Sequence, residues 1–314
     1  MKIGFLFPGP GAQSIGMGKD LYDKYEVVKN TYNKVKELTG IDVAEITFNS
    51  DEQILNETKN TQIAILTMSL AILEILKENR INAKMSAGLS LGEYTALINS
   101  KAINFEDGVK LVQKRGEYMQ KLVPNGEWSM AAVLGLNDTQ VEDVCKQVES
   151  GFVVPVNFNC PGQVVVSGEK TAVEEAAAKA KEAGARMAKV LKTSGPFHTE
   201  KLTEAAKALR EDLEKVEINK FETEVVKNLD GCAYTEIDNV QEILEKHMIS
   251  SVKFSKCLET MMNNGIDTFI EIGPGKTLSG FVKRMPTDKQ INILNINNVE
   301  TLENTINFVK EGMK

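Results

Sequence analysis

A serine between two glycines is the first candidate for chemistry. The stretch Gly88-Leu89-Ser90-Leu91-Gly92 has the pattern GxSxG and lies between an apolar segment, 85–89, and a helical pattern that starts at Leu91. In that context the glycines allow strand and helix to approach on a tight turn that presents the serine hydroxyl. The N–H of the next residue then faces a developing oxyanion. The pattern predicts Ser90 as a nucleophile and Leu91 as an oxyanion donor; the alternative is a chance GxSxG in a loop.

Only two histidines, His198 and His247, are available as a base for such a serine. His198 stands in the Gly-Pro turn 194–199, just before an amphipathic helical pattern. A helix N-terminus disfavours the protonated ring and keeps the imidazole neutral and basic. We therefore predict His198 as the general base, with a capping or packed histidine as the alternative. His247, on a helical segment, is interpreted as structural.

One arginine lies on an apolar helical stripe. In the helix predicted from Phe105, positions 105, 108, 112, 115, 119 and 122 share one face and hold Phe, Gly, Val, Arg, Met and Leu. A guanidinium that faces the core needs an anionic partner. That partner of Arg115 is a carboxylate either of the protein or of a substrate, which arginine binds in a bidentate fork. The pattern favours neither.

The elements that must position these residues form an α/β pattern. Strands are predicted over 2–7, 85–89, 224–228, 268–272 and 291–296, with helices between them, the first over 20–38. Between 126 and 193 the order becomes strand, helix, strand, strand, helix, strand, which is the ferredoxin-like βαββαβ pattern. We predict a main body of residues 1–125 and 194–314 and an inserted small domain of residues 126–193. A ligand cleft is expected at their border.

Composition excludes several classes of function. The net charge of −7 provides no basic footprint for nucleic acid or a membrane surface. The four cysteines lie far apart with no CxxC, so neither a metal site nor a redox pair is predicted. GxGxxG fails at Ser14, and the P-loop pattern fails at Ile270. The apolar run 3–7 is too short for a signal peptide and no later run approaches a membrane span. A cytoplasmic enzyme without metal or cofactor is expected.

Several motifs, in this order and at this spacing, resemble the malonyl-CoA:acyl-carrier-protein transacylase family of fatty acid synthesis. They are FPGPGAQ (7–13), Thr61-Gln62, GLSLGEY (88–94), KRGEYMQ (114–120), VNFNCPGQVVVSG (156–168), GPFHT (195–199) and EIGPGKTLSGFVKR (271–284). The resemblance covers nearly the whole chain. It implies an α/β-hydrolase-like main body with an inserted ferredoxin-like small domain.

The resemblance also implies roles for residues. Ser90 would be the nucleophile, His198 the base, and Arg115 the ligand of the free malonyl carboxylate, with Gln62, Met119 and Phe197 also at the substrate. The implied reaction is a ping-pong transfer of malonyl from malonyl-CoA, through a malonyl-serine, to the phosphopantetheine thiol of acyl carrier protein. No cofactor is implied. The alternatives are a serine hydrolase or thioesterase that passes the acyl group to water, and a catalytically weak module that binds the carrier protein.

Three residues depart from the family pattern. Relatives have histidine at the position of Leu89, and glutamine at that of His247, where the backbone carbonyl orients the base. Relatives also have FPGQGxQ, and the N–H of the glutamine in GQG forms half of the oxyanion hole. Pro10 stands there in this chain, and proline has no N–H. We predict that the N–H of Gly11 replaces it, because the flanking glycines allow the loop to shift.

Overall fold

Two separate sheets organise the protein in the computed structural model, which describes residues 1–191 and 195–312. The larger sheet is parallel throughout, with the order β7 (Glu224–Val226), β2 (Met85–Gly88), β1 (Ile3–Phe7), β8 (Thr268–Ile272), β9 (Asn292–Ile296). The smaller sheet is antiparallel, with the order β4 (Val153–Cys160), β5 (Gln163–Glu169), β3 (Trp128–Leu134), β6 (Met187–Val190). The predicted α/β class, with a strand-rich insertion, is confirmed at this level.

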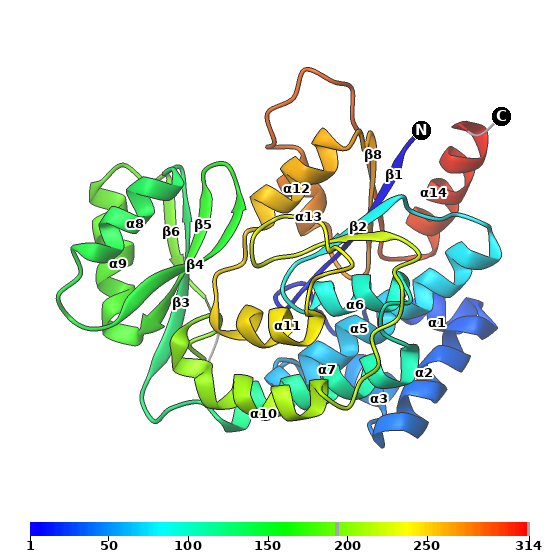
Figure 1. The fold of residues 1–314 in the computed structure, drawn as a ribbon, viewed down its shortest axis with the longest axis horizontal. Coiled ribbons are helices and arrows are strands. Elements are labelled where there is room, and N and C mark those ends of the chain that lie inside the picture. Colours follow the sequence, from blue (N-terminus) through cyan, green and yellow to red (C-terminus); the bar gives the residue numbers. More distant parts are fainter. Residues whose placement is uncertain (192–194, 313–314) are drawn as a thin grey trace.

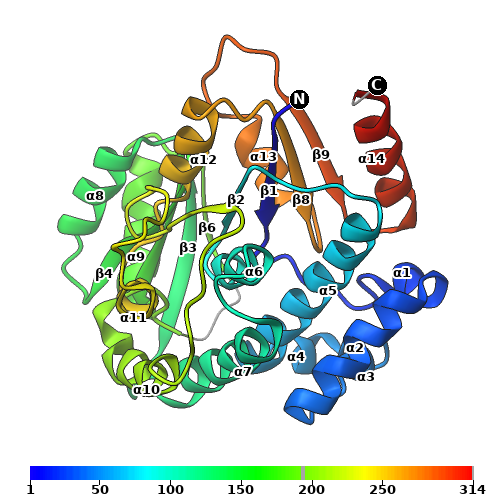
Figure 2. The same cartoon turned by 45° about the vertical axis from the view of Figure 1, so that its right-hand side comes forward.

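Helices cover both faces of the parallel sheet (Figure 1). Those packed against its strands are α5 (Thr58–Glu78), α6 (Gly92–Asn99), α12 (Phe254–Asn263), α13 (Thr277–Val282) and α14 (Val299–Gly312). The other helices of the main body are α1 (Lys19–Lys24), α2 (Glu26–Thr39), α3 (Val43–Phe48), α4 (Glu52–Leu55), α7 (Phe105–Lys121), η1 (Glu200–Leu202), α10 (Thr203–Leu213) and α11 (Val240–Ile249). Figure 2 shows β1, β2, β8 and β9 side by side, with α14 beside β9.

The single helix predicted over 20–38 is wrong, because the chain breaks at Tyr25. This residue has an extended backbone, φ −112° and ψ 120°, that ends α1 and begins α2. Leu21, before the break, and Val28, Tyr32 and Val35, after it, are all buried. The apolar spacing therefore continues across the break, which is why the pattern predicted one helix.

Helix α5 is the central helix of the main body. Nearly all its residues are buried, and it packs against α2 and α7. By length and hydropathy it is long and apolar enough to span a membrane, so the prediction that no run approaches a membrane span is wrong. Of that stretch, however, 89% is buried inside the protein. A helix that is apolar on all sides is also what the core of a large domain requires.

The small sheet has two different faces. Helices α8 (Asp138–Lys146) and α9 (Lys170–Glu182) cover one face, where Ala131, Val133 and Val164 form a core with them. Met130 and Ala132, which alternate with these residues along β3, point to the other face and line a cavity against the main body. The edge strand β4 is also hydrogen-bonded to the main body through Val252.

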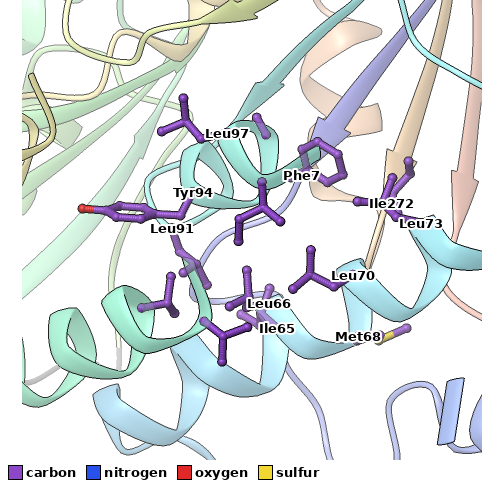
Figure 3. Close-up of a cluster of buried hydrophobic side chains, with 14 of the residues drawn as sticks. Phe7, Ile65, Leu66, Met68, Leu70, Leu73, Leu91, Tyr94, Leu97 and Ile272 are labelled. Carbon is purple, nitrogen blue, oxygen red and sulfur yellow. The ribbon is translucent and has the colours of Figure 1, made fainter. Parts of the chain in front are cut away.

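Helix α6 follows β2 and is held firmly in the core. Figure 3 shows Leu91, at the start of α6, on the side toward Ile65 and Leu66 of α5, and Leu97 and Phe7 belong to the same buried cluster. These residues are fully buried. The start of α6, and with it the turn that carries Ser90, is therefore fixed by packing rather than by local sequence alone.

Candidate active site

The turn between β2 and α6 has the strained geometry of a nucleophile elbow. Ser90 has a φ of +54°, a left-handed conformation that is rare for residues with a side chain. A Cβ on Gly88 would lie 1.9 Å from the carbonyl carbon of Gly92, so no larger residue fits there. Such observed strain is a reason to look for function.

An asparagine holds this strained turn. The N–H of Ser90 donates to Oδ1 of Asn228 at 2.8 Å, and Nδ2 of Asn228 donates to the carbonyl of Gly88 at 2.7 Å. Asn228 follows β7, which pairs in parallel with β2, so the carboxyl ends of both strands meet at one edge of the sheet. The bonds across this edge fix Ser90 from both sides.

The structure brings Ser90 and His198 together. Oγ of Ser90 lies 2.7 Å from Nε2 of His198, and Nδ1 of His198 lies 3.1 Å from the backbone carbonyl of His247. A carbonyl can only accept, so Nδ1 carries the proton and Nε2 is free to accept the proton of the serine. No carboxylate among the described residues is hydrogen-bonded to His198. A carbonyl therefore takes the place of the acidic member of a Ser-His-Asp triad.

The base is neutral over a wide pH range. Burial, with a further contribution from the charge of Arg115, lowers the pKa of His198 to about 4. A helix N-terminus would also lower the pKa of His198, as expected from the sequence, but burial is the largest cause in the structure. At neutral pH the imidazole is ready to accept a proton.

Arg115 is buried beside the nucleophile without a protein carboxylate. Its side chain is 1% exposed. One terminal nitrogen donates to Oγ of Ser90 at 3.0 Å, and the other donates to Oε1 of Gln62. No ion pair within residues 1–191 and 195–312 includes this guanidinium. Its hydrogen-bond partners in the described residues are neutral, although the charge of the buried Glu93 also acts on it.

A cavity of about 660 Å³ opens at Ser90 between the two sheets. Main-body residues that line it include Ser90, His198, Gln62, Met119, Phe197 and the loop Pro8–Gln13, and small-sheet residues that line it include Met130, Ala132, Asn157, Asn159 and Val165. Nε2 of Gln62 contacts the sulfur of Met119 at 3.4 Å. Gln62, Met119 and Phe197, which the resemblance placed at the substrate, therefore lie in one cavity with the Ser-His pair. In the described part of the chain, no group of three metal-ligating side chains is found.

The two predicted oxyanion donors differ in the structure. No acceptor in the described residues engages the N–H of Leu91, which directly follows Ser90. By contrast, the N–H of Gly11 donates to Oε1 of Gln13 at 2.7 Å, and Nε2 of Gln13 donates to Asn56. The Gly11 amide is therefore occupied in this structure. Its role as the replacement for the N–H missing at Pro10 stays a prediction that requires Gln13 to release it.

We expect Pro10→Gln to change the acylation rate by less than ~10-fold, because a neutral surface hydrogen bond such as that of Gln13 contributes only about 1 kcal/mol and Gly11 can be released. The measurement is single-turnover acylation by malonyl-CoA. Gln13→Ala is the matched control, since it frees the Gly11 N–H directly and should maintain or raise the rate. A gain of ~100-fold or more in Pro10→Gln, the usual value of one oxyanion donor, would mean that the second donor is missing.

Two buried residues of this region were missed by sequence reasoning. Asn228 was part of a predicted strand, and its position two residues after the end of β7 was the available signal. Glu93 lies in the first turn of α6, directly before the buried segment Tyr94–Ile98, and is itself fully buried. An acidic residue at the start of an apolar helix was the available signal there.

Comparisons with known proteins agree on one family. Residues 4–300 match the model of the acyl transferase domain. The chain is 41% identical over 312 residues to the malonyl CoA-acyl carrier protein transacylase of Bacillus subtilis, covering 99% of this chain and 98% of the relative. The crystal structure of malonyl CoA-acyl carrier protein transacylase from Clostridium perfringens superposes with a TM-score of 0.93 at 45% identity, covering 100% and 98% of the two chains. A malonyl-transacylase in complex with its type II PKS acyl-carrier protein gives a TM-score of 0.93 at 34% identity, covering 98% and 100%.

Proposed function

This chain belongs to the acyl transferase domain family, and from that premise we propose that it transfers malonyl from malonyl-CoA to the phosphopantetheine thiol of an acyl carrier protein. The relatives named for this activity match over almost their full length, and one is bound to its carrier protein. Such an acyltransferase supplies fatty acid synthesis. The choice of malonyl as the acyl group rests on the buried guanidinium of Arg115. Its terminal nitrogen lies 3.0 Å from Oγ of Ser90, and it forms no ion pair with a carboxylate among the described residues.

The first half-reaction is the acylation of Ser90. Nε2 of His198 accepts the hydroxyl proton while Oγ attacks the thioester carbonyl carbon. The N–H of Leu91 donates to the oxyanion of the tetrahedral intermediate. The carbon–sulfur bond then breaks, and the proton on His198 passes to the sulfur of CoA, which leaves as a thiol.

The second half-reaction reverses this path with a different thiol. The phosphopantetheine thiol gives its proton to His198 and attacks the carbonyl carbon of malonyl-Ser90. The bond to Oγ breaks, and Oγ takes the proton back from His198. Because a thioester is consumed and a thioester is formed, the exchange needs no nucleotide as an energy source.

Arg115 gives the reaction its acyl preference. A malonyl carboxylate that replaces Gln62 and Ser90 Oγ at the guanidinium forms the bidentate fork that arginine favours. This fork holds the thioester carbon over Oγ, and a misplacement of about 1 Å at such a site costs ~100-fold in rate. Phe197, beside the base, leaves little room for a branch next to the thioester.

The cavity also suits the pantetheine arm that both thiols share. The side-chain oxygens of Asn157 and Asn159 are buried and have no hydrogen-bond partner among the described residues. Both residues line the cavity. Pantetheine contains two amide N–H groups, which such oxygens can accept. We therefore assign these two asparagines to the arm.

The finer description of the fold is part of the same proposal. We propose a hydrolase-like main body, residues 1–125 and 194–314, and a ferredoxin-like small domain, residues 126–193; residues 192–194, at this border, lie outside the described residues. The order of the small sheet, with its first and third strands in the middle, supports the ferredoxin-like part. We propose a cytoplasmic location, where malonyl-CoA and the carrier protein are found.

Transfer to a purified carrier protein tests the function. The enzyme is incubated with malonyl-CoA labelled in the malonyl group, freed of excess substrate, and mixed with holo carrier protein. We expect label on the Ser90 peptide and then on the carrier protein. Apo carrier protein, which lacks the thiol, is the control and should receive none. Release of free malonate at the same rate with and without holo carrier protein would identify a thioesterase instead. A protein that binds the carrier protein but forms no malonyl-serine would be a binding module.

A further inference from the structure

A buried carboxylate that the mechanism does not use lies three residues after the nucleophile. Glu93, in the first turn of α6, is 0% exposed. Its Oε2 accepts the backbone N–H of Asn228 at 3.0 Å, and its Oε1 accepts the hydroxyl of Tyr234 at 2.6 Å. Oε2 also lies 3.4 Å from Nδ1 of His247. One side chain thus contacts the segment after β7, the loop beyond it, and α11.

Two of these contacts lead directly to the catalytic pair. The side chain of Asn228 binds the turn of the nucleophile, at the N–H of Ser90 and the carbonyl of Gly88. The carbonyl of His247 accepts from Nδ1 of His198 and so orients the base. Glu93 is therefore hydrogen-bonded to the residue that positions the nucleophile, and it contacts the ring of the residue whose carbonyl positions the base. It is hydrogen-bonded to neither Ser90 nor His198.

The ionisable groups around Glu93 fit this role. Burial raises the pKa of Glu93 to about 7, opposed by the hydrogen bonds from Tyr234 and Asn228 and by the charge of Arg115, with Asp230 adding to the rise. Burial keeps His247 neutral by lowering its pKa well below 6.5. Nε2 of His247 has no partner in the described residues, so the side that faces Glu93 is its one polar contact.

A carboxylate at this depth is expensive for the fold. Burying an ionised group costs several kcal/mol, and an apolar side chain of similar volume is often neutral or stabilising in its place. The contacts that Glu93 makes are of the kind that fixes the geometry of a catalytic group from the next layer of residues.

We propose that Glu93 is a positioning residue that holds the nucleophile turn, through Asn228, and the base, through His247, in one geometry. This inference rests on the proposed roles of Ser90 and His198. It makes the two halves of the catalytic pair dependent on a single side chain, although they lie 108 residues apart in the sequence.

The test compares three variants of Glu93 in the full-length protein. Glu93→Leu removes all acceptors at similar volume, Glu93→Asp keeps the charge but withdraws the oxygens by one methylene, and Glu93→Gln keeps one oxygen. The matched control is Glu271→Leu, which removes another fully buried carboxylate, one that accepts the N–H groups of Leu278 and Ser279. Each is assayed by single-turnover acylation with malonyl-CoA over a range of concentrations and pH, and by thermal unfolding.

We expect Glu93→Leu to lower the limiting acylation rate ~100-fold, which is the cost of displacing a reacting group by about 1 Å. Glu93→Asp should lower it ~10-fold. The rate of Glu93→Gln should stay within ~10-fold of that of the original protein. The concentration for half-maximal rate should change less than ~3-fold, because the carboxylate clamp is untouched. The pH below which the rate falls should shift to lower values, because a displaced carbonyl of His247 accepts more weakly from Nδ1 of His198, and this hydrogen bond raises the pKa of the imidazole. Glu271→Leu should lower the melting temperature without shifting that pH.

The inference is overturned if Glu93→Leu has the same limiting rate per folded molecule as the original protein. If the leucine variant does not fold, the same criterion applies to Glu93→Asp. A Glu93→Gln variant as slow as Glu93→Leu would also overturn the inference, because it would show that the acceptor oxygens are not what matters. Reaction of Ser90 with a neutral fluorophosphonate is measured in parallel. If malonyl-CoA fails to acylate the original protein, the proposed function fails, and the fluorophosphonate rates still decide the role of Glu93.

Discussion

Ser90→Ala is expected to abolish the malonyl-enzyme while the fold remains intact. The substitution removes one hydroxyl whose hydrogen bonds, among the described residues, go to His198 and Arg115. It leaves the backbone hydrogen bond of residue 90 to Asn228 in place. In a serine protease, loss of the nucleophile lowers turnover by roughly 10⁶-fold. Mass spectrometry of the peptide that contains residue 90, after exposure to malonyl-CoA, should show the adduct in the original protein and none in the variant.

The control for this experiment is a buried serine outside the cavity. Ser69, on α5, donates its hydroxyl to the carbonyl of Ile272. Ser69→Ala should lower stability by about 1 kcal/mol, the value of one hydrogen bond, and still be acylated. Malonyl found on a cysteine peptide, or acylation that persists in Ser90→Ala, would refute Ser90 as the nucleophile.

Arg115→Ala should change the selectivity between acyl groups rather than remove activity altogether. The guanidinium is the only cation that contacts Oγ of Ser90 in the described residues, and a malonyl group differs from an acetyl group by its carboxylate. Truncating one partner of a buried, hydrogen-bonded charge pair costs about 2–5 kcal/mol, so malonyl transfer should fall by roughly 30- to 5,000-fold. Acetyl transfer should be spared or improved, because an uncompensated buried charge is removed.

Specificity constants for malonyl-CoA and acetyl-CoA, measured on the same preparations, test this expectation. Arg115→Lys is the informative companion, since lysine keeps the charge but cannot form the bidentate fork. It should fall between the original protein and Arg115→Ala for malonyl-CoA. An equal loss for both substrates in Arg115→Ala would show that the guanidinium supports the structure of the site and does not select the substrate.

The sequence determined those features of this protein that depend on neighbours along the chain. The elbow at Ser90 needs five consecutive residues between a strand and a helix. It can be predicted from the sequence because the two glycines meet a local steric requirement. Strand β8 has the predicted bounds, 268–272, because its residues form a continuous β-prone segment. The position of Arg115 on a buried stripe followed from helical periodicity alone.

Only the tertiary structure decided how these residues interact. Helical periodicity placed Arg115 toward the core, but its neutral partners, Gln62 and Ser90, lie on other elements. The group that orients His198 is a backbone carbonyl, which every residue has, so no residue type in the sequence could have revealed it. Likewise, the side chain of Gln13 occupies the N–H of Gly11, and this depends on how one short loop is folded.

Glu93 and Asn228 illustrate the physical reason. They are 135 residues apart, and their hydrogen bond forms because β7 pairs with β2 at the edge where α6 begins. A hydrogen bond requires its atoms within about 3 Å, whereas patterns in the sequence place whole elements only relative to solvent and core. The sequence therefore determined which residues could do chemistry, and the packing of strands and helices decided which atoms meet.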